Sequence, residues 1–452
     1  MRTSPGAARV DGAGGAPCGK VEAMRKRLKS LLPLRNEPER RAPPGSPLAY
    51  VLEPDLLRES NRVELLRRGE QAYPAMLAAI AGARDHVHLE TYILRSDATG
   101  KRFQQALIER AHAGVMVRLL YDSIGSFGLV SDEFLSELAS AGVEIVEFHP
   151  VTPWRRRLIV RLRSMGREAL AKLGRRPRRI EAREPSQWSV NRRDHQKVLV
   201  VDGLVAFTGG INIGDEYAPA PGGDWHDLHV RVEGPAALGF ARIFHRAWLK
   251  GDGDPFARPP RARPAGPQPE PMLAHTCDNF RLRSRRRFYA AYRHAIDEAQ
   301  SSVSIMNAYF VPDFRLIRSL KSAAERKVVV RVIVPAESDV RLVGFASRYL
   351  FERLLAAGVR IFEYSGRMMH AKAATVDGAW STIGSFNLDR RSMLHNLEAG
   401  LVILDRDFAK SLEREFDASL EACREVDLRA WRRRGAMQRF KEWFAHLFAY
   451  WL

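Results

Sequence analysis

The chain has 452 residues, of which 45% are hydrophobic and 28% are charged, and this globular composition excludes a disordered or fibrous protein. A chain of this length is expected to form two or three domains rather than one core. The formal net charge of +19 predicts an anionic partner, and by itself it fits nucleic acid and anionic lipid equally.

The basic charge is concentrated in three short segments. Residues 1–41 carry 10 basic against 4 acidic residues, residues 153–194 carry 14 against 4, and residues 429–452 carry 6 against 1. The other 345 residues together have a net charge of only −2. We therefore expect a nearly neutral body with basic attachments, the first of which is a partly disordered N-terminal segment at residues 1–48.

Neither a membrane span nor a disulfide framework is expected. No run reaches the roughly 18 apolar residues that cross a bilayer, and the N-terminus has no apolar signal core. The three cysteines, Cys18, Cys277 and Cys423, are too sparse for a disulfide framework and lack a metal-binding spacing. These features predict a soluble or peripheral protein of the cytoplasm.

Two similar halves are predicted, at residues 49–254 and 273–428, joined by a Pro-rich linker at residues 255–272. The clearest match is LASAGVEIVEF (138–148) with LLAAGVRIFEY (354–364), at an offset of 216 residues. Two apolar strands also repeat, VMVRLLYD (115–122) as VVVRVIVP (328–335) and HVHLETYIL (86–94) as SVSIMNAYF (302–310). Helices alternate with buried strands in each half, which predicts a duplicated α/β fold.

A basic insertion at residues 149–194 interrupts the first half. The step from Phe148 to His195 takes 47 positions, whereas the equivalent step from Tyr364 to His370 takes only 6. A charged insertion that ends at a chemical motif is typical of an active-site rim, and a solvated basic loop is the alternative. One helical face of the insertion is apolar and comprises Trp154, Leu158, Leu162, Met165, Ala169 and Leu173.

A chemical motif occurs once in each half, at the same place in the repeat. It reads His-x-Lys-x4-Asp and is followed by a Gly-Gly or Gly-Ser pair and then by Asn. Its members are His195, Lys197, Asp202, Gly210 and Asn212 in the first half, and His370, Lys372, Asp377, Ser385 and Asn387 in the second. One copy would be weak evidence, but two copies at equivalent positions indicate an active site.

The spacing of the motif suits phosphate chemistry. His and Lys two residues apart on a β-strand project from the same face, so both side chains enter one site. Two such pairs across a pseudo-twofold interface, with Asn212 and Asn387, would hold the oxygens of a phosphate and stabilise charge that develops during transfer. Asp202 and Asp377 each begin a turn, which favours a structural role over that of a general base.

The C-terminal residues 429–452 are predicted to form a basic, amphipathic helix. Arginines precede one aromatic face, which comprises Phe440, Trp443, Phe444, Leu447, Phe448, Trp451 and Leu452. This pattern suits a helix that lies among lipid headgroups, although a helix packed on the domain's own core would also show it. Together with the N-terminal segment and the insertion, it would hold the protein to the cytoplasmic face of a cell membrane as a peripheral protein.

The paired motifs resemble those of the phospholipase D superfamily, which is defined by two HKD motifs. The resemblance covers about residues 65–425 and is greatest to bacterial cardiolipin synthases. It is carried by TGGINIGDEY (208–217), DWHDLHVRVEGP (224–235), NAYFVP (307–312), GSFNLDRRS (384–392) and NLEAGL (396–401). Two features depart from the family: Gly210 stands where many members have serine, and the N-terminal transmembrane helices of some members are absent.

The resemblance implies both a fold and a mechanism. The fold would be two tandem phospholipase D-type α/β/α sandwich domains, related by pseudo-twofold symmetry, with the active site at their interface. The chemistry would need no cofactor and no metal: His195 would attack phosphorus to form a phosphohistidine, and His370 would act as acid and base. The resemblance also pairs Asp227 with His370 and Glu398 with His195; from the sequence alone the two carboxylates are unremarkable, and surface carboxylates are the alternative.

These expectations favour a cardiolipin synthase that transfers a phosphatidyl group between two phosphatidylglycerol molecules and releases glycerol. A hydrolytic phospholipase D, phosphodiesterase or nuclease of the same superfamily would use the same residues. A nuclease would spread basic residues along a groove in its body. Because that body is nearly neutral, we expect anionic phospholipid, and not nucleic acid, as the partner. A catalytically idle binding module would have no need of paired histidines.

Overall fold

The computed structural model describes residues 46–151, 153–172, 191–219, 223–256, 272–280 and 286–451. These residues belong to one compact unit, Pro47–Leu452, apart from Ser46. Residues 1–45 of the predicted basic segment at residues 1–48, most of the Pro-rich linker and residues 173–190 of the insertion lie outside the described ranges. None of the helices within those ranges is both long and apolar enough to span a membrane.

The first half alternates strands and helices as its sequence predicts. Its strands are β1 (Arg58–Arg67), β2 (His86–Thr91), β3 (Met116–Asp122), β4 (Glu144–Phe148), β5 (Val198–Val201), β6 (Val205–Gly209) and β7 (Leu228–Glu233). Its helices are α2 (Arg68–Ala81), α3 (Ala98–His112), α4 (Asp132–Ser140), α5 (Pro153–Lys172) and α6 (Pro235–Lys250), with short 3-10 turns η1 (Pro47–Tyr50), η2 (Pro54–Leu56) and η3 (Asp215–Tyr217). Side-chain caps fix two helix starts, because Asp97 and Ser131 accept hydrogen bonds from backbone N–H groups of α3 and α4.

The second half repeats this order and adds elements at its C-terminal end. Its strands are β8 (Met272–Asp278), β9 (Ser302–Asn307), β10 (Val329–Pro335), β11 (Arg360–Tyr364), β12 (Lys372–Val376), β13 (Trp380–Gly384), β14 (Ala399–Leu404) and β15 (Cys423–Glu425). Its helices are α7 (Arg287–Glu298), α8 (Phe314–Glu325), α9 (Arg341–Leu355), α10 (Arg390–Leu394), α11 (Arg406–Leu420), α12 (Leu428–Arg432) and α13 (Ala436–Leu447).

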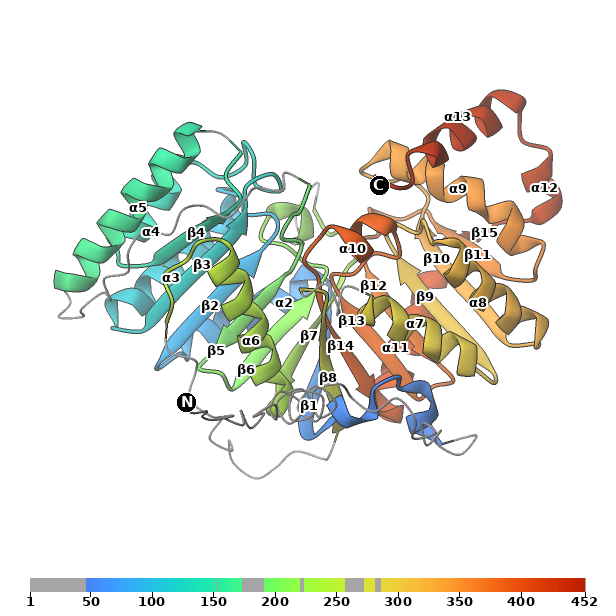
Figure 1. The fold of residues 1–452 in the computed structure, drawn as a ribbon, viewed down its shortest axis with the longest axis horizontal. Coiled ribbons are helices and arrows are strands. Elements are labelled where there is room, and N and C mark those ends of the chain that lie inside the picture. Colours follow the sequence, from blue (N-terminus) through green and yellow to red (C-terminus); the bar gives the residue numbers. More distant parts are fainter. Residues whose placement is uncertain are drawn as a thin grey trace, which may run out of the picture. The chain divides into compact units, whose positions relative to one another are not determined.

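The strands form one continuous sheet in which the two halves run in equivalent orders (Figure 1). The first half is ordered β4-β3-β2-β5-β6-β7-β1, and the second is ordered β11-β10-β9-β12-β13-β14-β8, with β15 added at the outer edge. Strands β1 and β8 pair in antiparallel fashion and join the halves. The α/β class and the duplication are therefore confirmed, and the shared sheet is a feature that the sequence did not predict.

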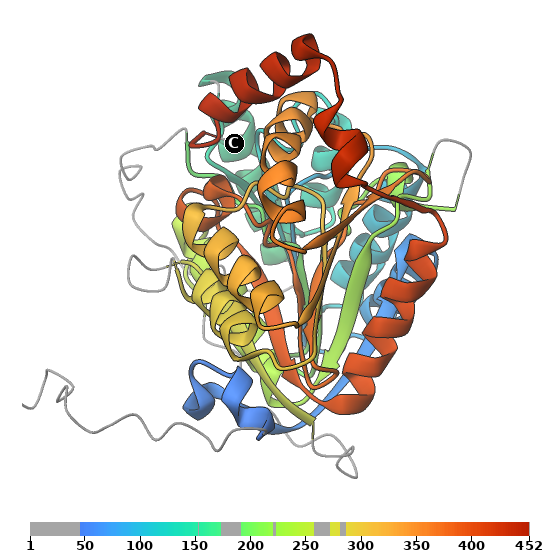
Figure 2. The same ribbon diagram turned by 90° about the vertical axis from the view of Figure 1, so that its right-hand side faces the viewer.

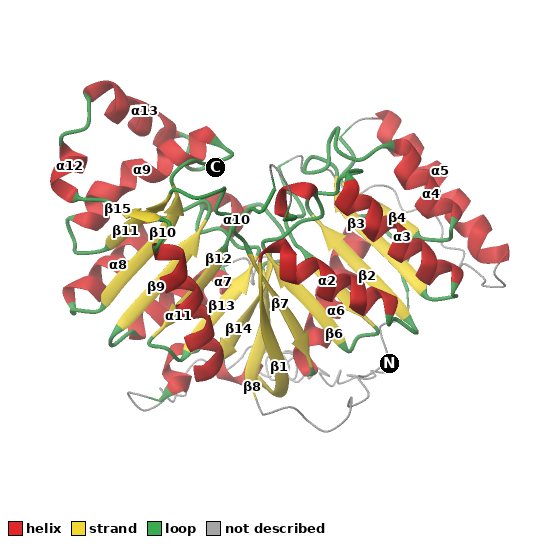
Figure 3. Cartoon of the chain, turned by 180° about the vertical axis from the view of Figure 1, so that it is seen from behind, coloured by secondary structure: helices red, strands yellow, loops and turns green. Residues whose placement is uncertain are grey.

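Helices cover both faces of the sheet (Figure 3), because the buried strands alternate their side chains between two cores. In β5, Leu199 and Val201 belong to the core beneath α2 and α3, whereas Val198 and Val200 join a core shared by both halves. That shared core also contains residues of α6 and α11. Figure 2 shows the same layering in the second half, where α7 and α8 lie on one face and α11 on the other.

Helix α5 corrects the expectation that the apolar face of the insertion is available to a membrane. Leu162 is buried, and Leu158 and Met165 are partly buried, all three packing on the core of the first half. Of the predicted apolar face, Trp154 stays exposed at 53%. The sequence periodicity was correct, but the face is used mainly for packing because it lies against α4 and β4.

The C-terminal residues form two helices instead of the single helix predicted for residues 429–452. Asp427 caps α12, and Gly435 precedes α13, so the chain turns between them. Helix α13 packs along α9, as Figures 1 and 2 show, with Glu442 and Ala445 buried against it. The aromatic face of α13 points outward, since its predicted residues from Phe440 to Trp451 are 41% to 58% exposed to solvent.

Candidate active site

Each His-x-Lys pair lies at the start of a buried strand, where the two halves meet. The sequence placed both residues on the strand itself, but β5 begins after Lys197 and β12 begins at Lys372. The backbone explains the difference. The N–H group of His195 donates to the carbonyl of Leu397 in the other half at 3.0 Å, and that of His370 donates to His226 at 2.7 Å. Each motif is therefore held by a segment of the opposite half.

The carboxylate partners of the imidazoles are likewise exchanged between the halves. Glu398, from the second half, lies 3.0 Å from Nδ1 of His195 in the first. Asp227, from the first half, lies 2.8 Å from Nδ1 of His370 in the second. Both carboxylates are fully buried. Because an ionised carboxylate only accepts hydrogen bonds, each Nδ1 carries the proton, and each Nε2 is left for the substrate.

Burial favours the neutral form of both imidazoles, and more strongly for His195 than for His370. Burial, together with the charges of Lys197 and Lys372, lowers the pKa of His195 well below its usual range. Burial and Lys372 also lower the pKa of His370, while the hydrogen bond that His370 donates to Asp227 opposes this shift. A neutral imidazole has the lone pair that a nucleophile needs, and the buried carboxylate stabilises the positive charge that follows attack.

The two lysines point back toward their own histidines. The Lys197 ammonium donates to the backbone carbonyl of His195 at 2.7 Å, and Lys372 makes the same bond to His370. Burial lowers the pKa of Lys197 to about 7 and that of Lys372 to about 8. Each bond uses one of three ammonium N–H groups, so both lysines retain donors for an anionic group placed between the histidines.

Glu398 is supported by a network from the second half. The hydroxyl of Ser385 donates to one carboxylate oxygen, and the Asn396 amide lies 3.4 Å from the other. The backbone N–H of Glu398 donates to Asn279 at 2.8 Å. Burial raises the pKa of Glu398 to about 7, against the opposing effects of Lys197 and the Ser385 hydroxyl. Ser385 thus acts on His195 through the carboxylate.

Gly210 occupies the equivalent position to Ser385 but plays a different part. A Cβ atom on Gly210 would lie 2.2 Å from Oδ1 and 2.5 Å from Oδ2 of Asp227, closer than any real contact. The carboxylate therefore fills the space where a side chain would stand. The departure from the usual serine is explained by this close approach of Asp227.

The two asparagines of the motifs, Asn212 and Asn387, differ in the hydrogen bonds that their side chains make. The oxygen of Asn212 accepts from the backbone of Ile93 at 3.1 Å, and its amide donates to the hydroxyl of Tyr217 at 2.8 Å. The oxygen and the nitrogen of the Asn212 side chain thus both bond within the protein, whereas the sequence predicted that this side chain would bind phosphate. The Oδ1 atom of Asn387 is buried and has no hydrogen-bond partner among the described residues.

Asp202 and Asp377 follow the far ends of β5 and β12 from the two His-x-Lys pairs, and their contacts agree with the structural role that their turns predicted. Asp202 follows β5, five residues after Lys197, and accepts hydrogen bonds from the backbone N–H groups of residues 84, 85 and 86. Asp377 accepts equivalent bonds from residues 300, 301 and 302 and one from the hydroxyl of Tyr50. Both aspartates adopt positive φ angles and fix the start of the neighbouring strand, β2 or β9.

Four aromatic residues around the histidines were not singled out from the sequence. The rings of Tyr92 and His195 lie 4.8 Å apart, and Trp225 and Tyr217 lie 5.7 and 6.0 Å from His370. Tyr309 lies 6.2 Å from His370 on another side. Tyr217, Trp225 and Tyr309 fall inside the sequence stretches that carry the family resemblance, and this was the available signal.

Comparisons with known proteins agree with this site. A family model described as "Cardiolipin synthase, PLD-like domain" matches residues 76–248 and 292–420, and each segment contains one His-x-Lys pair. The cardiolipin synthase of Geobacillus kaustophilus (strain HTA426) is 32% identical over 405 residues, which cover 87% of this chain and 74% of that protein. Cardiolipin synthase B of Salmonella typhi is 35% identical over 374 residues, covering 82% and 83%.

A solved structure shares the fold. The crystal structure of phosphatidylserine synthase from Haemophilus influenzae Rd KW20 aligns with a TM-score of 0.60 and covers 86% of this chain and 95% of that chain. The sequences are only 12% identical, so the likeness concerns the fold alone.

Proposed function

The chain belongs to the phospholipase D-like cardiolipin synthase family, and on this premise we propose that it transfers a phosphatidyl group from one phosphatidylglycerol molecule to another, releasing glycerol and forming cardiolipin. One observation carries the proposal: two buried histidines, each oriented by a carboxylate of the opposite half. This arrangement supplies one nucleophile and one acid–base group around a shared centre.

In the first step, Nε2 of His195 attacks the phosphorus of phosphatidylglycerol. A nitrogen–phosphorus bond forms, the phosphorus–oxygen bond to the glycerol headgroup breaks, and protonated His370 gives its Nε2 proton to the departing oxygen. Glu398 stabilises the positive charge on the phosphorylated imidazole, and Asp227 stabilises the imidazolium form of His370 beforehand.

In the second step, neutral His370 accepts the proton from a glycerol hydroxyl of a second phosphatidylglycerol. The resulting oxygen attacks phosphorus, the nitrogen–phosphorus bond breaks, and His195 returns to its neutral form. His370 has regained its proton, so the cycle is balanced. Lys197 and Lys372 both act electrostatically on His195, and Lys372 also acts on His370, so both ammonium groups can stabilise the phosphate oxygens in each step.

A hydrolytic phospholipase or phosphodiesterase is the second candidate, because water in the second step would give phosphatidic acid from the same intermediate. The transferase is favoured because the curated relatives described above are cardiolipin synthases that align over most of their length. The near-neutral body of the chain, with net charge −2 outside three basic segments, also favours a lipid over nucleic acid.

We place the protein peripherally on the cytoplasmic face of the cell membrane. The supporting observation is the outward aromatic face of α13, where bulky rings next to arginines suit the headgroup layer of an anionic leaflet. Cys277 and Cys423 are free thiols, which fits a reducing compartment.

The test uses purified protein with vesicles that contain phosphatidylglycerol as the sole substrate, and mass spectrometry of the products. Cardiolipin and free glycerol in equal amounts are expected, whereas phosphatidic acid alone would refute the transferase. His195→Ala should abolish turnover. His370→Ala should retain a phosphatidyl adduct on His195, detectable as added mass on the peptide that contains it, and an adduct on another residue would overturn the assignment of the nucleophile.

A further inference from the structure

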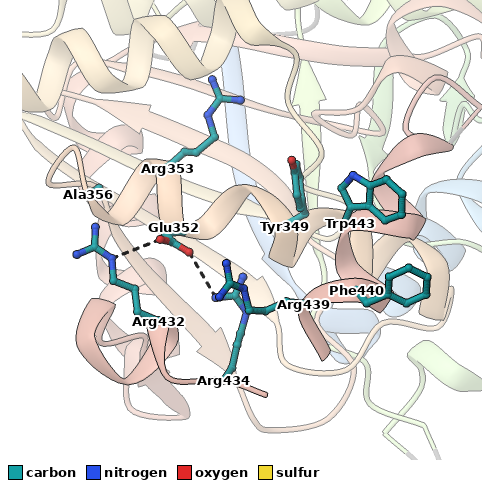
Figure 4. Close-up of a pocket in the computed structure, with 9 residues that line it drawn as sticks. All are labelled: Tyr349, Glu352, Arg353, Ala356, Arg432, Arg434, Arg439, Phe440 and Trp443. Atoms are coloured by element: carbon teal, nitrogen blue, oxygen red, sulfur yellow. Dashed lines mark hydrogen bonds and ion pairs between the residues drawn. The ribbon is translucent and has the colours of Figure 1, made fainter. Parts of the chain in front are cut away.

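A pocket of about 590 Å³ lies between α9 and the two C-terminal helices, apart from the catalytic residues (Figure 4). Helix α9 forms one wall, and α12, α13 and the turn between them form the other. The lining residues are Tyr349, Glu352, Arg353, Ala356, Arg432, Arg434, Arg439, Phe440 and Trp443. None of these residues takes part in the chemistry proposed above.

The pocket carries more positive charge than its own carboxylate can balance. Glu352 lies 3.3 Å from Arg432 and 3.6 Å from Arg434, as the dashed lines in Figure 4 show. It is the only acidic residue among four arginines in the lining. Arg353 and Arg439 are exposed and have no carboxylate within ion-pair distance in the part of the chain that the structure describes.

Contacts within the fold fix the position of Arg434 in the wall of the pocket. Arg434 is held at 2.9 Å by Glu442, which is fully buried between α13 and α9, and its guanidinium lies 4.7 Å from the centre of the Trp431 ring. A guanidinium fixed in this way is preorganised, so little side-chain freedom is lost when an anion binds beside it. The pocket thus combines one fixed arginine with others that remain available.

The apolar side of the same pocket belongs to the aromatic face of α13. Phe440 and Trp443 line the pocket and are also the first members of the exposed row that continues to Trp451. Arginines next to exposed aromatic rings match a phospholipid, whose phosphate binds guanidinium groups while its acyl chains contact apolar surface. The basic N-terminal segment of the chain has the wrong charge to occupy this pocket.

We propose that this pocket is a second, non-catalytic lipid site that binds the phosphate of an anionic phospholipid in the membrane surface. Arg353 and Arg439 hold the phosphate, Arg434 supports them, and Phe440 and Trp443 contact the glycerol backbone and upper acyl chains. The site anchors the enzyme to membranes that are rich in anionic lipid, where its proposed substrate is also found.

The test compares two charge-matched double variants by sedimentation with vesicles. R353Q/R439Q removes the two available arginines of the pocket. The control, R62Q/R102Q, removes two exposed arginines on β1 and α3, so its net charge is the same. With vesicles of phosphatidylglycerol and phosphatidylcholine, the pocket variant should bind about thirtyfold more weakly, the effect of two basic residues at an anionic surface, and the control less than threefold.

Three results would overturn the proposal. Equal weakening in both variants would show a general charge effect, and unchanged binding of R353Q/R439Q would show that the pocket does not contact lipid. Full displacement of the protein from vesicles by millimolar inorganic phosphate at constant ionic strength would identify a soluble anion site instead.

A separate measurement distinguishes this proposal from the proposed activity. In detergent micelles, where binding to a bilayer is not needed, R353Q/R439Q should form product at the wild-type rate. Loss of turnover in micelles would mean that the two arginines serve the reaction and not membrane anchoring, and would refute the non-catalytic role.

Discussion

Substitution of Gly210 by alanine tests whether Asp227 orients His370. The new Cβ would lie 2.2 Å from Oδ1 of Asp227, whereas an ordinary contact needs about 3.4 Å, so the carboxylate must move by roughly 1.2 Å. The hydrogen bond between Asp227 and His370, 2.8 Å long, cannot survive a displacement of that size along its axis. A misplacement of about 1 Å near the reacting atoms lowers rates on the order of a hundredfold.

The assay is the initial rate of cardiolipin formation from phosphatidylglycerol vesicles, and Gly82→Ala is the matched control. At Gly82, which follows α2, the added Cβ would have its closest contacts at 3.5 and 3.6 Å, both ordinary distances. We expect about a hundredfold loss for Gly210→Ala and less than a twofold change for Gly82→Ala. Thermal unfolding shows whether each variant is folded.

A double-mutant cycle identifies the route by which Gly210 acts. In Asp227→Ala the carboxylate is gone, so there is space for a methyl group at position 210. Adding Gly210→Ala to that variant should cost no further activity, because both changes disable the same hydrogen bond. If the two losses multiply, or if Gly210→Ala alone has the wild-type rate, the argument that Gly210 exists to admit Asp227 is wrong.

Three further predictions concern ionisation, the motif aspartates and the aromatic face. The rate should be highest near pH 7 and fall on both sides: Glu398 must be ionised to hold His195 and is protonated below its pKa of about 7, while Lys197 and Lys372 lose their charges above their pKa values of about 7 and 8. Rate–pH profiles check this, and Glu398→Gln should remove the fall on the acid side; a wild-type rate that is flat from pH 5 to 9 would contradict it. Asp202→Ala should lower the free energy of unfolding by about 2 kcal/mol, measured with urea, since three backbone donors lose their acceptor; unchanged stability with lost activity would restore a catalytic role. Phe444→Ala should weaken binding to anionic vesicles about tenfold, whereas Val329→Ala, at the exposed start of β10, should not; equal binding of both variants would show that the aromatic face does not enter the membrane.

The sequence predicted the elements of the fold well because the periodic patterns were strong. The repeated strands have equivalent places in the sheet, and helix α5 of the insertion is found where its pattern put it, whereas the C-terminal segment forms two helices instead of one. The pairing of β1 with β8 in the middle of the sheet was not predictable, because a strand carries no local signal that names its partner.

The sequence could not predict, for a physical reason, whether the apolar face of an amphipathic helix points inward or outward. An apolar face looks the same whether it packs on a core or enters a membrane. In α5 the face is used for packing, as the burial of Leu162 shows. In α13 the helix instead packs through Ala445 and the buried, ion-paired Glu442, which leaves the aromatic face exposed. Only the three-dimensional contacts separate these two outcomes.

The histidines and lysines of the site were predictable from a duplicated spacing, but their partners were not. Glu398 and Asp227 lie 203 and 143 positions from the histidines that they contact. No local pattern encodes such a distance, and only the family resemblance indicated these pairs. The Gly210 position was noticed as a departure, yet its reason lies in the volume that Asp227 occupies.

The C-terminal segment joins the proposed membrane contact to the active site. The backbone carbonyl of Trp451 accepts a hydrogen bond from Arg391 in α10 at 3.4 Å, and the ring of Tyr450 lies 5.8 Å from that of His395, just after the same helix. The chain continues within three residues to Glu398, which holds His195. A lipid layer that binds the aromatic face therefore lies beside the segment that carries the catalytic carboxylate. Since a phosphatidyl group must leave the bilayer to reach a buried histidine, this short connection favours catalysis at the membrane surface over catalysis on dispersed lipid.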